Sequence, residues 1–178
     1  MAVSHVKATG ITNADASPAV ANTAGEIGGP APLKVVSSGS VVAIAADSID
    51  TTYQFCRVPS NAKIQAIFFE SAAQAAGAMD IGAYYATDGL GGKPTALLAA
   101  AAIDQDFFAS AVSVAALSQP TNVVNESGTN TPAKRVQPLW QALGLTSDPG
   151  GNFDICGTVT TAITTGTGSM GMTVMYTD

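Results

Sequence analysis

The chain has 178 residues, which is enough for one ordinary domain, because a single core typically takes about 100–200 residues. Charged residues make up 11% of it, less than half of the roughly 25% usual in soluble domains, whereas hydrophobic residues make up 47%. A surface with so few charges must consist largely of Ser, Thr, Ala, Asn and Gln. Such a surface is weakly solvated and suited to contact with other chains.

Charge and hydropathy exclude two classes of partner. The net charge is −6, and the seven Lys and Arg residues are scattered, so the concentrated basic footprint that nucleic acids require is absent from the sequence. The longest apolar run, residues 96–103, is far too short to cross a bilayer, so we expect no membrane partner. Because residues 1–10 lack the apolar stretch of a signal peptide, we expect synthesis in a cytoplasm without export.

Residues 1–34 differ from the rest of the chain. They are rich in Gly, Pro, Asn, Ser, Thr and Ala, show no sustained period of 2 or 3.6, and cannot alone bury enough apolar surface to offset the entropy of ordering. Two hypotheses stay open: a floppy tail, or an extended arm that becomes ordered along a neighbouring subunit, with Val20, Ile27 and Leu33 as spaced anchors. Residues 35–178 are predicted to form the folded domain.

From Ser40 onward, short apolar segments alternate with turn signals at spacings typical of an all-β domain. The predicted strands are residues 41–46, 53–58, 62–69, 79–86, 107–112, 153–163 and 170–177. The segments with turn chemistry are residues 47–50, 59–61, 88–94, 148–152 and 164–168. Sheets with one apolar face must pack face to face, so we predict an antiparallel β-sandwich, with a jelly-roll-like arrangement favoured over an immunoglobulin-like one.

Three segments depart from the strand pattern. Thr95–Ala102 is rich in Ala and is predicted to coil into a short helix, and Ser118–Thr131 is predicted to be an exposed loop. Pro138–Gly144 has Pro where a first helical position tolerates it and Gly where helices commonly end, which predicts a turn or two of helix. The residues expected to anchor that helix on the sandwich are Leu139, Trp140 and Leu143.

Alternation is clearest in the two predicted strands nearest the carboxyl end. One face of the first strand carries Phe153, Ile155, Val159 and Ile163, and the other carries Asp154, Thr158, Thr160 and Thr164. In the second strand, Met170, Met172, Val174 and Tyr176 lie opposite Thr173 and Thr177. We predict that these two strands pair as a hairpin closed by residues 164–168.

The two cysteines, Cys56 and Cys156, are too few for a disulfide scaffold, and a reducing site of synthesis predicts free thiols. Cys56 lies among strand residues and is most simply a small core hydrophobe. Cys156 shares the face that carries the threonines and is expected to face a neighbour.

Sequence motifs for catalysis and cofactors are weak. The only histidine, His5, lies in the unpatterned first segment, where a triad would have no rigid base. Two distant cysteines and one histidine do not supply a compact zinc site. The run Gly166–Gly171 matches GxGxxG, but the chain then continues as a strand, whereas the dinucleotide motif needs a helix. We therefore expect no enzyme, and no catalytic, cofactor-binding or metal-binding residues.

Two aspartate pairs could in principle bind Ca²⁺ through hard oxygen atoms. Asp104 and Asp106 would point to the same side of an extended segment, and Asp47 and Asp50 flank a predicted turn. No EF-hand spacing surrounds either pair. We therefore favour simple solvation of these carboxylates over metal binding.

Several short runs together resemble small head decoration, or cement, proteins of tailed bacteriophages. The resembling runs are Tyr53-Gln-Phe-Cys-Arg-Val-Pro-Ser-Asn-Ala62, Asp80-Ile-Gly-Ala-Tyr84, Phe107-Phe-Ala-Ser110, Leu139-Trp-Gln-Ala-Leu-Gly144 and Asp148-Pro-Gly150. The resemblance spans roughly residues 50–177. It implies a mostly β protein that forms a homo-oligomer, most simply a trimer, and sits on the exterior of a virion capsid, where it binds the lattice of major capsid proteins.

Two other functions stay open from the sequence. One is a tail or head-fibre component of a virion. The other is a carbohydrate-binding β-sandwich, with Tyr84, Tyr85 or Trp140 as stacking platforms. Exposed aromatic rings beside a groove would favour carbohydrate binding, whereas buried rings would remove that hypothesis.

Overall fold

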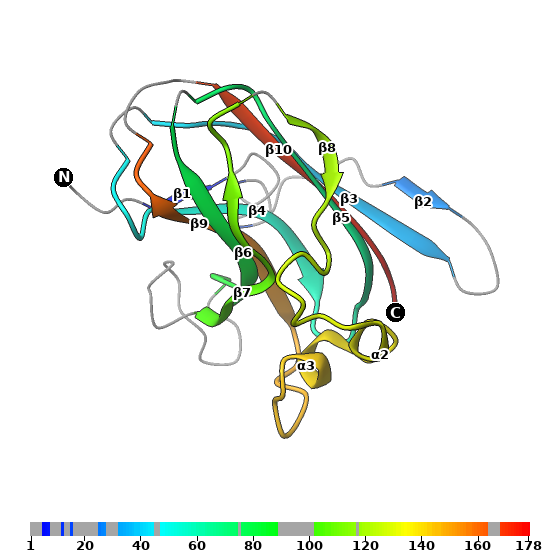
Figure 1. The fold of residues 1–178 in the computed structure, drawn as a ribbon. Coiled ribbons are helices and arrows are strands. Elements are labelled where there is room, and N and C mark those ends of the chain that lie inside the picture. The colour runs from blue at the N-terminus through cyan, green and yellow to red at the C-terminus, as the bar shows by residue number, and fades with distance from the viewer. Residues whose placement is uncertain are drawn as a thin grey trace.

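The chain folds into two five-stranded β-sheets that lie face to face (Figure 1). The computed structural model describes residues 5–7, 12, 15, 25–27, 32–44, 47–74, 76–88, 102–116, 118–163 and 168–178. Sheet A contains, in spatial order, β1 (His5–Lys7), β4 (Thr52–Pro59), β9 (Asn152–Thr161), β6 (Ala78–Tyr85) and β7 (Ala102–Ser113). Sheet B contains β2 (Gly25–Ile27), β3 (Leu33–Val42), β10 (Ser169–Thr177), β5 (Lys63–Ser71) and β8 (Ser118–Asn122). The predicted all-β sandwich is confirmed.

Strand pairing is antiparallel throughout these sheets except between β1 and β4, which are parallel. From β3 to β10, consecutive strands lie in opposite sheets, with β6 and β7 as the exception. This alternation is consistent with the favoured double-sheet jelly roll.

The inward faces of the two sheets form one hydrophobic core. Phe55 on β4 meets Phe69 on β5 edge to face, with ring centroids 5.8 Å apart, so this contact joins sheet A to sheet B. The thiol of Cys56 lies 3.6 Å from the carbonyl oxygen of Met172 on β10, a second contact between the sheets. The predicted inward residues of the last two strands, from Phe153 to Tyr176, are all buried in this core.

The predicted hairpin near the carboxyl end is wrong. β9 pairs with β4 and β6 in sheet A, whereas β10 pairs with β3 and β5 in sheet B. Alternation shows which face of a strand is buried, but it does not show which strand lies beside it. The connection from residue 162 to residue 168 is long enough to cross the roughly 10 Å between packed sheets.

The predicted loop Ser118–Thr131 is also partly wrong, because its first residues form β8, which pairs with β5. Later in the same segment, Val123, Val124 and Asn130 are buried, with the Asn130 side chain donating to the carbonyl oxygen of Val124 at 2.9 Å. A polar segment can still form a strand where the edge of a sheet offers it backbone hydrogen-bond partners. β8 pairs with β5 in this way and becomes the edge strand of sheet B.

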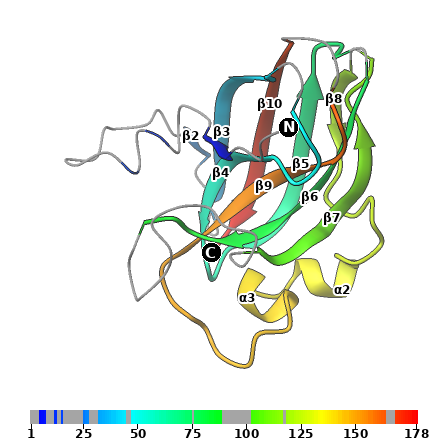
Figure 2. The same ribbon diagram turned by 90° about the vertical axis from the view of Figure 1, so that its left-hand side faces the viewer.

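Two short helices cover one end of the sandwich (Figure 2). The predicted one is α3 (Leu139–Ala142), which follows Pro138 and ends before Gly144, whose φ of 80° suits glycine. Leu139 is buried, and Trp140 and Leu143 pack partly buried against the core, as predicted. The second helix, α2 (Pro132–Arg135), was not predicted. The predicted helix at 95–102 lies outside the described residues up to residue 101, and Ala102 begins β7.

The first segment of the chain contributes strands to both sheets. β1 pairs with β4 through three residue pairs, and β2 pairs with the start of β3 through three more. β3 begins at Leu33, eight residues before the predicted strand at Val41, so it includes the end of the predicted arm. The division at residue 34 stays a prediction.

Candidate functional site

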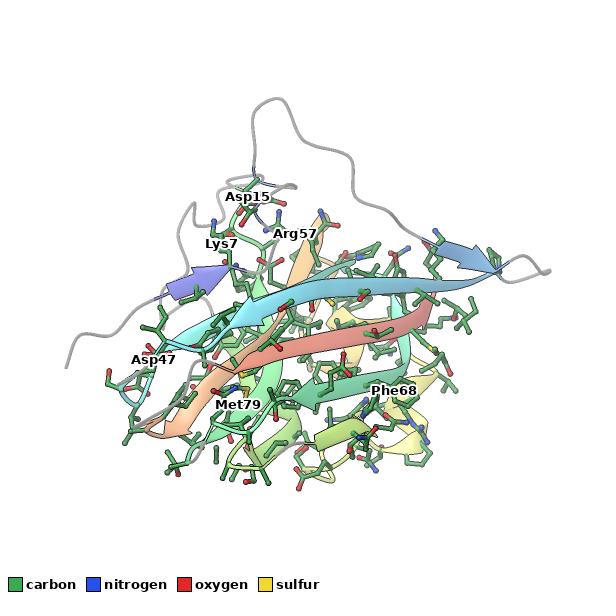
Figure 3. The ribbon with its side chains drawn as sticks, turned by 90° about the horizontal axis from the view of Figure 1, so that it is seen from above. Lys7, Asp15, Asp47, Arg57, Phe68 and Met79 are labelled. Carbon is green, nitrogen blue, oxygen red and sulfur yellow. The ribbon has the colours of Figure 1, made fainter. Side chains whose placement is uncertain are left out.

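A polar network on sheet A joins the first segment of the chain to the sandwich. Its centre is Arg57 on β4, and its innermost member is Asp154 on β9. Thr87, just after β6, and Asp15, from the first segment, complete it on the outer side. Figure 3 shows Lys7, Asp15 and Arg57 close together beside the sandwich.

Asp154 holds the guanidinium of Arg57 in a fixed orientation. Nε of Arg57 donates to Oδ1 of Asp154 at 2.7 Å, and Nη2 donates to Oδ2 at 3.0 Å. The Gln54 side chain and the backbone N–H of Thr87 also donate to Oδ2, at 2.7 and 3.3 Å. This bidentate pairing fixes the plane of the guanidinium. The position of Nη1, on the outer side of Arg57, is therefore fixed as well.

The carboxylate of Asp15 lies beside Nη1 of Arg57. Nη1 of Arg57 donates to Oδ1 of Asp15 at 2.6 Å, while the hydroxyl of Thr87 donates to Oδ2 at 3.2 Å. The ammonium of Lys7 also donates to Oδ2, at 2.6 Å. The side chain of Asp15 is 15% exposed, compared with 30% for Lys7 and 11% for Arg57. One carboxylate is therefore clamped between two cations and a hydroxyl.

The two carboxylates of the network have opposite pKa shifts. Burial acts to raise the pKa of Asp15, but hydrogen bonds from Lys7 and Arg57 and the charges of both outweigh it, so the pKa of Asp15 lies below its ordinary value. Asp154 is fully buried, and burial raises its pKa although Arg57 and the Thr87 N–H partly offset the effect. The network therefore favours the charged form of Asp15. Burial disfavours the charged form of Asp154, and Arg57 reduces that effect.

This arrangement is suited to recognising a carboxylate. A guanidinium fixed from behind by a buried acid, with a hydroxyl beside it, presents donors that are already oriented for an oxygen anion. We call Arg57 and Thr87 the carboxylate socket. In this chain the socket contains Asp15.

The aromatic residues considered as carbohydrate platforms are not free. Tyr84 is 2% exposed, and its hydroxyl lies 2.5 Å from that of Thr158. Tyr85 packs against Phe153 with ring centroids 6.0 Å apart, and Trp140 packs partly buried against the core. Packing of these rings against the protein therefore argues against the carbohydrate hypothesis.

The predicted solvation of the two aspartate pairs holds for Asp50 and Asp106, which are exposed, but not for every member. Asp47 is 3% exposed, accepts a hydrogen bond from the Tyr53 hydroxyl, and forms an isolated bridge with Ile163, so its predicted solvation is wrong. Burial raises the pKa of Asp104, and so does the neighbouring Asp106 carboxylate, which can accept a hydrogen bond from the protonated form of Asp104. Among the described residues, no group of three or more His, Cys, Asp and Glu side chains is placed to hold a metal ion.

Both cysteines are free thiols in the structure. Cys56 is 1% exposed and belongs to the main core, as predicted. Cys156 is fully buried and packs with Tyr84 and Ala102, so the expectation that it faces a neighbour is wrong. The reason is that β9 is covered on both of its faces.

The outer face of sheet B is weakly charged. Core residues Ile67, Phe69 and Val174 alternate with side chains that point the other way. Two rows of these outward residues cross the sheet: Val35, Met175 and Ala66, then Ser37, Thr173 and Phe68. Figure 3 labels Phe68 on this part of β5. Beside the rows, a shallow hollow of about 400 Å³ is lined by Ser37, Ser40, Glu70, Ser71 and Ser169, among others.

The carboxylate socket was not predicted from the sequence. The run Tyr53–Ala62, which contains Arg57, was noted for its resemblance, and Asp154 was placed on a polar face of its strand. The useful signal was an Arg and an Asp within strands that are otherwise almost uncharged, because a lone charge in such a strand needs a partner. The positions of Asp15 and Thr87 had no comparable signal.

None of the described helices is both long and apolar enough to pass through a membrane. No protein-family model matches the chain, and no curated protein matches it. The chain is similar to a solved chain from the cyanophage Pam1 capsid asymmetric unit, with 17% sequence identity and a TM-score of 0.48. That alignment covers 88% of this chain and 93% of the other.

Proposed function

We propose that this chain is a non-enzymatic structural protein of a phage virion, which decorates the capsid exterior by binding the lattice of major capsid proteins. In the proposal it acts as a homo-oligomer, most simply a trimer. The resemblance of residues 50–177 to cement proteins and the scarcity of charge support this function. The observation that carries it is the uncharged pair of rows across the outer face of sheet B.

An uncharged but partly polar face suits a contact that is repeated over a whole shell. Fixed charges are costly to desolvate unless each finds a partner, and the cores of interfaces are correspondingly poor in them. Phe68 and Met175 can supply apolar area on such a face, while Ser37 and Thr173 can supply hydrogen bonds. Because the protein would bind the assembled shell but not separated subunits, binding stabilises the shell by mass action.

Exposed apolar side chains at the end of β3 and in the connection from β3 to β4 extend this proposal. Val42 is 52% exposed, Ile44 48% and Ile49 54%, so three of the large exposed hydrophobic residues in the described chain lie within eight positions. Apolar side chains gathered in this way mark contact surfaces more often than isolated ones do. We assign Val42, the last residue of β3, and Ile44, two residues beyond it, to the same contact region as the outer face of sheet B.

Co-sedimentation with capsid shells that lack the protein tests the proposal. The unmodified chain is expected to pellet with the shells in a saturable manner. Phe68→Asp is expected to weaken binding at least tenfold while the chain stays folded, and Val136→Asp, at a site 69% exposed near α2, is the matched control that should bind normally. Failure of the unmodified chain to bind would overturn the proposed function, and normal binding by Phe68→Asp would overturn the proposed face.

The predicted arm belongs to the proposal as an additional attachment. A deletion of residues 1–34 would also remove Leu33 and Lys34 from β3, so a deletion of residues 1–24 is the cleaner variant. We expect it to stay folded and to be retained less well on the capsid. Unchanged retention would contradict a role for the arm.

A further inference from the structure

The carboxylate socket is complete without the residue that fills it. Asp154 contacts two nitrogens of Arg57, and the buried Gln54 side chain donates to both Asp154 and Thr87. Gln54 and Arg57 belong to β4 and Asp154 to β9, while Thr87 lies two residues after the end of β6. The donors that face Asp15 are therefore positioned by the sandwich itself, and a carboxylate from any chain with the same local sequence would find them in place.

The described residues of the segment that fills the socket contact the sandwich through β1, Val6 and two salt bridges. β1 adds only three residues to the edge of sheet A, and its pairing with β4 is the parallel one in otherwise antiparallel sheets. Lys7 and Asp15 add the salt bridges, and Val6 packs partly buried against the core. We call residues 5–15 the docking segment. Its contacts depend on the surface of sheet A and not on which chain the segment comes from.

The docking segment is joined to β2, which pairs with the start of β3, by residues 16–24. These nine positions span at most roughly 30–32 Å when fully extended. The sandwich itself has a thickness of only two sheets, about 10 Å apart. β2 and the first residues of β3 project away from the body of the sandwich (Figures 1 and 2). The chain between the two anchored parts can therefore reach a socket on a neighbouring copy.

We propose that the docking segment of one copy occupies the carboxylate socket of a neighbouring copy, so that Asp15 of one chain pairs with Arg57 and Thr87 of the next. This inference rests on the homo-oligomer in the proposed function. Exchange of an identical element adds no new type of contact, because each copy gives one segment and receives one. In a closed ring, every socket is then filled.

Disulfide trapping between separately marked chains tests the exchange. One chain carries Asp15→Cys, the other carries Thr87→Cys, and the two are co-expressed and oxidised. Because the native side-chain oxygens lie 3.2 Å apart, a disulfide joining the two chains is expected, seen as a band of twice the chain mass that reductant removes. A pair of chains with Val136→Cys and Thr87→Cys is the matched control and should remain unlinked.

A single chain with both Asp15→Cys and Thr87→Cys distinguishes the two arrangements. Exchange predicts covalent oligomers from this variant, whereas docking within one chain predicts only a cross-linked monomer. The cross-linked monomer, together with no product from the mixed chains, would overturn the proposal. These cysteines are added to a chain whose own two cysteines are buried, so those thiols contribute little background.

A second measurement does not depend on cysteine geometry. Sedimentation of the chain lacking residues 1–24 should show an oligomer that dissociates at least tenfold more readily than the complete chain. An unchanged association constant would overturn the exchange. Neither experiment contains capsid shells, so loss of the exchange leaves the co-sedimentation result intact, and failure of co-sedimentation leaves the exchange intact.

Discussion

Arg57 and Asp154 are direct cross-strand partners in the antiparallel pairing of β4 with β9. Residues opposite each other on neighbouring strands have their Cβ atoms about 5 Å apart, so the ion pair is built into the register of sheet A. Formation of this sheet therefore also forms the base of the carboxylate socket. The Arg57–Asp154 pair therefore contributes both to the stability of the fold and to the orientation of the Arg57 guanidinium in the socket.

Arg57→Ala is expected to destabilise the protein severely. It leaves the fully buried carboxylate of Asp154 without its cation, and breaking a buried pair in this way typically costs about 3–5 kcal/mol. Urea unfolding followed by circular dichroism measures the change. Asp178→Ala is a matched control, because it removes the more exposed Lys34–Asp178 pair and should cost about 1 kcal/mol or less. Equal losses for the two variants would contradict the structural role of Arg57.

Asp15→Asn should give a stability difference that depends on pH. The pKa of Asp15 is lower in the folded than in the unfolded chain, so its contribution is complete above the unfolded value of about 3.9 and is lost as the pH falls through the folded value. We expect the variant to be roughly 1 kcal/mol less stable than the unmodified protein above pH ~5, with the gap closing at lower pH. A gap that stays constant into strong acid would contradict this.

The sequence predicted the sheets well because period-2 alternation records burial directly. Phe153, Ile155 and Val159 are in the core as predicted, and Pro138 and Gly144 bound a real helix. Pairing is a different property. The Met170–Tyr176 face was identified correctly, yet its strand lies in the other sheet from Phe153, because inward-facing apolar residues look the same whichever sheet carries them.

The candidate site was harder to predict than the fold because its parts come from distant places. The site comes together only after β4, β6 and β9 have paired. Its residues are Asp15, Arg57, Thr87 and Asp154. Asp15 lies in a segment with no periodicity that could show which side chain points where. A single sequence contains residue types and spacings, whereas a polar network depends on contacts between strands far apart in the chain.

Gly82→Ala is expected to disrupt the edge of sheet A. A Cβ at this position would overlap the backbone carbonyls of Asp104 and Gln105, because β7 passes directly over β6 there. Backbone cannot move aside as the end of a flexible side chain can, so we expect a loss of about 3 kcal/mol or more, the upper end for overpacking. Gly171→Ala is the control, since its Cβ would lie 3.2 Å from the carboxylate of Glu70 and 3.3 Å from the carbonyl oxygen of Gly39, contacts that need a shift of only a few tenths of an ångström. A thermal melt that ranks Gly171→Ala as the more harmful change would contradict the close approach.

Both cysteines should be inert in the folded protein. Burial raises the pKa of the Cys56 thiol and also that of Cys156, with the charge of Asp154 adding to the effect in each case. A thiol reagent at neutral pH should therefore label neither residue in native conditions and both residues in denaturant. Rapid native labelling of Cys156 would mean that the outer face of β9 is open, contrary to its complete burial here.

Ile44→Asp should separate folding from association. Ile44 is 48% exposed, and the hydrogen bonds at this position use its backbone N–H, which a substitution keeps. Surface changes of this kind usually alter stability by less than about 0.5 kcal/mol. If the end of β3 is a contact surface, the charge must be desolvated there, and co-sedimentation with shells should weaken at least tenfold although the melting temperature is unchanged. Val136→Asp again provides the control, because it places the same charge on an exposed apolar position outside sheet B. Normal shell binding by Ile44→Asp would remove the end of β3 from the proposed contact region and leave the rows around Phe68 as its sole support.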